Sequence, residues 1–183
     1  MKKCILLSLI IVIISTYPVL ASGKSTCDGA LGLRWGDNFL QMAKTMLIEN
    51  EYNYKSMLDM GRKKNYLYTG DVSKNKADIM TELFDDKLYY IRVKFDLSNK
   101  NAVSEYNELK EYCINKYGKP DLEEAFKCLW LVSSSSNEDV RIYLRSDKNI
   151  LNISYTNEPL VLEAEKYEDE MSKEYLNDKY KNL

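Results

Sequence analysis

The sequence predicts an α+β protein in which helices pack against an antiparallel sheet. Two segments with apolar residues at helical spacing are each followed by three short runs rich in β-branched and aromatic residues. Short polar turns separate these runs, as expected for consecutive antiparallel strands. The order helix, strand, strand, strand therefore occurs twice, and a charged helical segment ends the chain. We expect a tandem repeat of this unit.

The first unit is expected to span residues 22–98. Trp35 and Gly36 indicate a turn, and Asp37 is the expected N-cap of a helix. Apolar residues then recur at helical spacing, at Phe39, Met42, Ala43, Met46 and Leu47. After an irregular stretch through residue 61, strands are predicted at residues 66–69, 77–84 and 88–95.

Side chains of the third strand alternate between two kinds. One set is apolar or aromatic and consists of Tyr89, Ile91, Val93 and Phe95. The other set consists of Tyr90, Arg92 and Lys94. A period of two predicts one buried face and one solvated face of the sheet.

The second unit begins with a helix predicted over residues 102–117 and is expected to end at residue 158. The helix has an apolar face formed by Val103, Tyr106, Leu109, Cys113 and Tyr117. Gly118 indicates the end of this helix. Strands are predicted at residues 126–132, 140–145 and 150–155. Asp86 and Asp147 occupy matching hairpin turns, as an internal duplication would produce.

Residues 159–183 are predicted to form a charged C-terminal helix. Its apolar and aromatic residues fall at spacings of three and four, at Leu160, Ala164, Tyr167, Met171 and Tyr175. Acidic and basic side chains fill the other faces. Three arrangements are expected for this helix: it packs against its own domain, it frays as a solvated tail, or it docks a partner or a second copy of the chain.

Residues 1–21 are predicted to be an export signal peptide. Lys2 and Lys3 precede an apolar run over residues 4–14, and small or aliphatic residues at 19–21 favour cleavage before Ser22. The alternative is an uncleaved anchor, although the apolar stretch is only marginally long enough to span a membrane. Cleavage predicts a periplasmic or secreted protein with no stable membrane span.

Export changes the interpretation of the cysteines. Cys27, Cys113 and Cys128 remain after cleavage, an odd number in an oxidising compartment. The simplest prediction is a disulfide between Cys113 and Cys128 with Cys27 unpaired. Two alternatives remain open: buried free thiols that act as small apolar side chains, or a bridge from Cys27 to either of the others.

The composition argues against several classes of function. Histidine is absent from all 183 residues, which removes histidine-activated nucleophiles, histidine general bases and histidine-containing zinc sites. A net charge of -2 and a pI near 5.4 argue against binding of nucleic acid. Asp85 and Asp86 favour a tight turn over a calcium site, because aspartate hydrogen-bonds its own backbone in turns. We expect no metal site and no cofactor.

A resemblance to a known group covers most of the chain after residue 21. The motifs that carry it are LGLRWGD before a helix, LFDDKLYYIRVKF, YNELKEYCINKYGKPD and IYLRSDKNILNISY. Its main residues are Trp35, Gly36, Asp85, Lys87, Leu88, Tyr106, Leu109, Tyr117, Gly118, Lys119, Pro120 and Trp130. The chain resembles a loose group of uncharacterised exported bacterial proteins with a domain of unknown function, which implies a fold and a compartment but no activity. In architecture alone it is similar to outer-membrane assembly lipoproteins and β-lactamase inhibitor proteins, which suggests a binding module.

One sheet face is the best candidate for a binding surface. If the helices cover one face, that face carries Ile91, Val93, Ile142, Leu144 and Ile153. The opposite face then carries Tyr90, Arg92, Lys94, Arg141, Tyr143 and Arg145. Tyrosine and arginine are effective interface anchors because they combine apolar area with directed hydrogen bonds. The alternative is an ordinary solvated face whose basic groups pair with nearby acids.

Two classes of function fit these features. The first is an exported, non-catalytic binding or envelope-scaffold protein that holds a protein or an anionic envelope component. The second is a small periplasmic or secreted hydrolase that works with carboxylates alone, as glycosidases do. No pair of acids stands out at a spacing that would favour the hydrolase.

Overall fold

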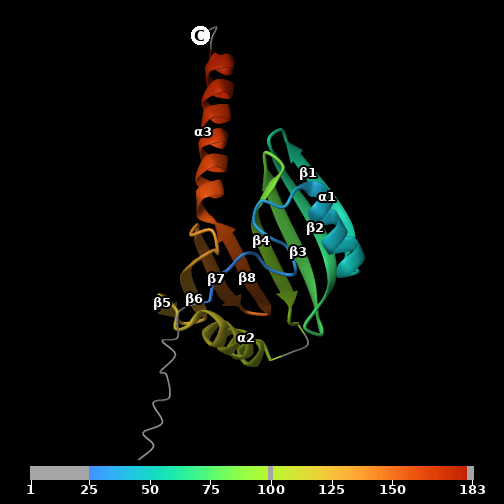
Figure 1. The fold of residues 1–183 in the computed structure, drawn as a ribbon, viewed down its shortest axis with the longest axis vertical. Helices are drawn as coiled ribbons and strands as arrows, with labels where there is room; N and C mark the ends of the chain where they lie inside the picture. The colour runs from blue at the N-terminus through green and yellow to red at the C-terminus, as the bar shows by residue number, and fades with distance from the viewer. Residues whose placement is uncertain (1–24, 99–100, 181–183) are drawn as a thin grey trace, which may run out of the picture.

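A computed structural model of the protein describes residues 25–98 and 101–180 (Figure 1). The predicted signal peptide, residues 1–21, lies outside the described residues. The strands are β1 (Asn53–Met60), β2 (Lys63–Val72), β3 (Asn75–Phe84), β4 (Lys87–Asp96), β5 (Leu122–Glu124), β6 (Lys127–Ser133), β7 (Asp139–Asp147) and β8 (Ile150–Asn157). The helices are α1 (Phe39–Lys44), which continues as the π-helix η1 (Thr45–Glu49), α2 (Ala102–Tyr117) and α3 (Glu158–Tyr180).

The strands form one eight-stranded antiparallel sheet in the order β1-β2-β3-β4-β8-β7-β6-β5. The two hairpin series meet in the middle, where β4 pairs with β8 and Val93 lies opposite Ile153. The α+β class with an antiparallel sheet is therefore confirmed. Four strands follow each of α1 and α2, whereas the sequence predicted three. The additional strands, β1 and β5, are the two sheet edges, and all their side chains are exposed.

Local signals determine where α1 and α2 begin and end. The N-cap of α1 is Asn38, which forms a capping box with Gln41. The predicted cap at Asp37 was wrong, because that carboxylate accepts a hydrogen bond from the Arg34 amide instead. The predicted helix 102–117 coincides with α2, which ends at Gly118 in a positive-φ conformation.

Both α1 and α2 cover the same face of the sheet, which we call the helix-covered face. The central strands contribute Ile91, Val93, Phe95, Ile142, Leu144 and Ile153 to it, all buried. The helices contribute Met42, Met46, Tyr106, Cys113 and Tyr117 to the same cluster. Trp130 is fully buried beside them, and its indole N–H donates to the Gly118 carbonyl at 2.8 Å. The prediction of which face is buried is confirmed.

Tyr89 departs from the predicted alternation. The register between β3 and β4 shifts after Glu82, which pairs with Tyr90, so that Leu83 pairs with Leu88 and Tyr89 is the extra residue of a bulge. Tyr89 is buried as predicted, but it packs in a second cluster with Phe84 and Ala164. A bulge turns a side chain away from its regular face, and that explains the difference.

Helix α3 lies on the other side of the sheet. Ala164 is buried there, and Leu160, Val161 and Tyr167 pack around the second cluster. The helix then projects past the end of the sheet (Figure 1), and Met171 and Tyr175 are exposed. None of the helices in the described part of the chain is long and apolar enough to cross a membrane.

Cys27, Cys113 and Cys128 are free and buried in the structure. The predicted disulfide between Cys113 and Cys128 is not formed, and the structure instead has the alternative of buried free thiols. Helix α2 packs Cys113 into the core, and the Cys128 sulfur lies 3.2 Å from the Tyr106 hydroxyl. Burial raises the pKa of the Cys113 thiol to about 12, which keeps it protonated and unreactive at neutral pH.

Candidate binding face

The face of the sheet opposite α1 and α2 is called the open face here, and its central part lies on β4, β8 and β7. The structure places all six residues of the predicted patch on it, namely Tyr90, Arg92, Lys94, Arg141, Tyr143 and Arg145. None of them is fully buried. The alternation of β4 and β7 therefore gathers these side chains as expected, although nothing in the fold itself shows that they bind a partner.

Strand register arranges the patch in rows that run across the three strands. Arg92 and Tyr143 both pair with Ser154 of β8, from its two sides. Lys94 and Arg145 flank Asn152 in the same manner. Neighbouring strands lie about 4.8 Å apart, so each basic residue of β4 is about two strand spacings from its counterpart on β7.

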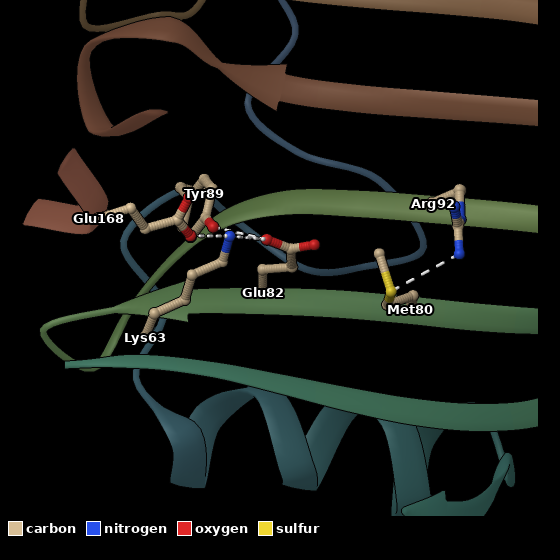
Figure 2. A network of polar contacts seen from close by, with 6 residues as sticks. All are labelled: Lys63, Met80, Glu82, Tyr89, Arg92 and Glu168. Carbon is tan, nitrogen blue, oxygen red and sulfur yellow. Dashed lines mark hydrogen bonds and ion pairs between the residues drawn. The ribbon is translucent and has the colours of Figure 1, made fainter. Parts of the chain in front are cut away.

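The basic residues of the patch differ in how they are paired. Within the described part of the chain, Arg92 and Lys94 form no ion pair, and the nearest polar contact of Arg92 is the Met80 sulfur at 3.6 Å (Figure 2). Arg145 lies 3.4 Å from Asp147, and both side chains are about half exposed. Such an exposed pair contributes little and can be exchanged for a partner's carboxylate.

Arg141 is different because it anchors α3. Its guanidinium donates two hydrogen bonds to the Glu158 carboxylate, at 2.8 and 2.5 Å. These bonds raise the pKa of Arg141 despite the opposing effect of partial burial. Since Glu158 is the first residue of α3, Arg141 holds the start of that helix against β7. Among the six predicted residues, Tyr90 also has a structural contact, because it packs against the second cluster beneath α3.

Lys63, on β2, is a second anchor that the sequence analysis did not single out. Figure 2 shows it between two carboxylates, with the Lys63 amine 3.2 Å from Glu82 and 2.6 Å from Glu168 of α3. The Tyr89 hydroxyl donates to the same Glu82 at 2.5 Å. Burial alone would lower the pKa of Lys63, but the bonds to Glu168 and Glu82 outweigh it and raise that pKa.

A hollow of about 270 Å³ lies between α3 and the open face, beside these anchors. Glu82, Glu165 and Glu168 line it together with Lys63 and Arg141. A hydrolase that uses two carboxylates needs one acid kept protonated and one free to ionise. Here Lys63 bridges Glu82 and Glu168 in two ion pairs, an arrangement that suits a structural contact.

Asp85 and Asp86, considered above as a turn or a cation site, form the hairpin turn between β3 and β4. Both have positive φ angles, which aspartate tolerates in tight turns. The Asp85 carboxylate accepts hydrogen bonds from the Arg62 guanidinium, which lowers its pKa. Asp86 accepts a bond from the Phe39 amide at 3.0 Å and so ties the turn to α1. The turn interpretation is therefore confirmed.

The comparison with known proteins found no relative of the chain. No protein-family model, curated protein or solved structure matches the chain.

Proposed function

We propose that the protein is an exported, non-catalytic binding or envelope-scaffold protein that holds its partner on the open face. The observation that carries this proposal is the gathering of two tyrosines and four basic side chains on β4 and β7, with Arg92 and Lys94 in no ion pair within the described residues. Basic groups without a carboxylate partner leave electrostatic attraction for an incoming acidic group. The partner is a protein with an acidic surface or an anionic component of the envelope.

Apolar contacts beside the patch favour a protein among these partners. Tyr143 pairs with Leu129 of β6, and Leu131 on the same strand is 54% exposed. Interfaces combine such apolar area with tyrosine and arginine anchors, whereas recognition of a simple polyanion needs positive charge alone. The charged helix α3 borders the patch at the Arg141 end and offers a second contact for the same partner.

The proposal includes an origin by tandem duplication of residues 22–98 and 99–158. The strand order supports it. From the centre outward, one half runs β4, β3, β2, β1 and the other runs β8, β7, β6, β5, so each half is a series of hairpins that ends with its first strand at the edge. One helix precedes the four strands of each half. A duplicated unit joined through its last strands produces a wide, continuous open face that neither half would have alone.

Charge reversal on the open face tests the proposal. The variant Arg92→Glu, Lys94→Glu, Arg145→Glu removes the basic groups that are free or weakly paired, and it leaves the Arg141 anchor intact. A matched control, Lys44→Glu, Lys74→Glu, Lys119→Glu, makes the same change in net charge at exposed lysines outside the open face. Both variants are cross-linked in intact cells and compared with the wild-type protein.

A specific cross-linked partner that the control retains and the open-face variant loses supports the proposal. The effect is expected to exceed tenfold, because each reversed charge turns an attraction into a repulsion. Equal recovery of the partner by all three proteins would contradict it, provided that circular dichroism shows the same folded content in each. Recovery lost equally in both variants would assign the effect to net charge and also contradict the proposal.

A further inference from the structure

A partly open cavity lies on the helix-covered side of the sheet, away from the open face. It has a volume of about 340 Å³ and lies where β4 meets β8, between α2 and the N-terminal segment that contains Gly29 and Leu31. Neither α1 nor α2 covers this junction fully, and the N-terminal segment crosses it (Figure 1). Pockets that hold small molecules start at about 300 Å³, so the cavity is large enough for one.

The floor of the cavity is apolar and belongs to the sheet. Val93, Phe95, Leu151 and Ile153 line it, and each is at most 5% exposed. The charged side chains of the lining all lie on α2: Glu108 and Lys116 are exposed at the rim, and the half-buried Glu105 accepts a hydrogen bond from Asn75 at 2.9 Å. A charged ligand would lose its hydration on contact with the floor and find no opposite charge there. A neutral apolar ligand would not pay this cost.

One polar group inside the cavity lacks a partner. Tyr155 of β8 lines the cavity and is 92% buried, since its exposed fraction is 8%. Within the described residues its hydroxyl forms no hydrogen bond, and burial raises the pKa of Tyr155 well above its ordinary value. The hydroxyl oxygen itself is not fully enclosed, because among the described residues Asn65 Oδ1 is the fully buried side-chain polar atom without a partner, so the Tyr155 hydroxyl remains accessible to a hydrogen-bond partner. A ligand in the cavity can supply that partner.

We propose that this cavity binds a small, neutral, mostly apolar molecule with one hydrogen-bonding oxygen, which accepts a bond from the Tyr155 hydroxyl. The apolar floor supplies affinity, and the single hydroxyl supplies orientation and selectivity. This cavity is separate from the open face. It is therefore a second binding site, and it does not depend on the function proposed for the open face. The N-terminal segment forms one wall, and Leu109 of α2 forms another.

The test uses three probes that share a phenyl ring and a short chain. These are 4-phenyl-2-butanone, a neutral ketone; butylbenzene, which has no polar group; and 4-phenylbutyrate, an anion. Each is titrated into the uniformly ¹⁵N-labelled protein while the backbone amide signals are followed. The ketone is expected to shift the amides of Gly29, Leu31 and Ile153 in a saturable manner. It is expected to bind at least about tenfold more tightly than the anion, because burying a carboxylate is costly.

Two variants separate a specific site from nonspecific contact. Tyr155→Phe keeps the ring and removes the hydroxyl, and it is expected to weaken binding of the ketone about threefold to tenfold while butylbenzene binds as before. Leu109→Trp fills the cavity and is expected to abolish binding of all three probes. Glu111→Trp is its control, since it adds the same ring on the exposed side of α2 and should leave binding unchanged.

Each result decides the matter. No saturable shift at millimolar ketone, or shifts at other amides only, would overturn the proposal. Unchanged ketone binding by Tyr155→Phe would overturn the assigned role of its hydroxyl, and undiminished binding by folded Leu109→Trp would overturn the cavity as the site. If Leu109→Trp does not fold, the comparison of ketone with butylbenzene in Tyr155→Phe decides alone, because a loss of packing would weaken both probes equally.

Discussion

The two faces of the same sheet have opposite chemistry, although their residues alternate along the same strands. On β4, Ile91 and Val93 are almost completely buried under the helices, whereas Arg92 and Lys94, which alternate with them, are half-buried and form no ion pair within the described residues. The helix-covered face therefore provides the stability of the fold. The open face contributes little to it and is available for recognition, except where α3 covers one end.

Shortening two neighbouring side chains of β4 should reveal the largest difference between the two faces. Ile91→Ala should lower the free energy of unfolding by about 2 to 5 kcal/mol, because it opens a cavity in the core beneath α1 and α2. Arg92→Ala should change it by less than about 0.5 kcal/mol, as for an ordinary surface position. Urea unfolding followed by circular dichroism measures both. Similar losses in the two variants would show that the open face is part of the core.

Alkaline pH should weaken the helix-covered face through Cys113. Burial raises its pKa from 9.0 to about 12, so the folded protein holds this proton more tightly than the unfolded chain does. The stability that results is fully present below pH 9 and is lost as the pH rises towards 12. By pH 10.5 the loss from Cys113 should reach about 2 kcal/mol.

The free energy of unfolding, measured by urea at pH 8 and pH 10.5, checks this prediction. The variant Cys113→Ala removes the thiol and should show a smaller fall between the two pH values, although it is less stable at both. An equal fall in the variant and the wild type would attribute the alkaline loss to other groups. Buried tyrosines are the alternative source, because burial raises the pKa of Tyr68 to about 12 as well.

Local sequence signals predicted the parts of this molecule whose determinants are close together in the chain. Helix α2 has an amphipathic face and ends at Gly118, so its range could be predicted to the residue. The alternation in β4 and β7 predicted the two faces of the sheet and all six residues of the candidate site. The edge strand β1 was missed because its side chains are all exposed, which leaves no apolar alternation to detect.

The anchors of α3 could not be predicted, because they depend on long-range register. Lys63 and Glu168 are 105 positions apart, and neither belongs to a recognisable motif. The direction of Tyr89 depends on a bulge, which requires the pairing of β3 with β4 to be known. Likewise, the cavity beside Tyr155 forms only when α2, the N-terminal segment and both halves of the sheet are assembled.

The smallest expected loss of stability comes from Lys63, where the open face holds α3 in place. Lys63→Met should lower the free energy of unfolding by about 1 to 2 kcal/mol, because it leaves the largely buried Glu82 carboxylate without its cation. Lys64→Met is the matched control on the same strand. Its ion pair with Asp59 is 3.8 Å long and exposed, so the loss should stay below about 0.5 kcal/mol.

Lys63 can stabilise the protein in two ways, by neutralising Glu82 and by anchoring α3 through Glu168. Hydrogen exchange of the α3 amides tests the second. If the lysine anchors α3, the Lys63→Met variant should exchange faster in α3 than the wild type, while β6 and β7 keep their protection. Unchanged protection of α3 would mean that Arg141 and the second cluster suffice to hold the helix. Faster exchange with unchanged partner binding would place the anchors of α3 outside the binding surface, which would then consist of Arg92, Lys94 and Arg145 with their neighbouring tyrosines.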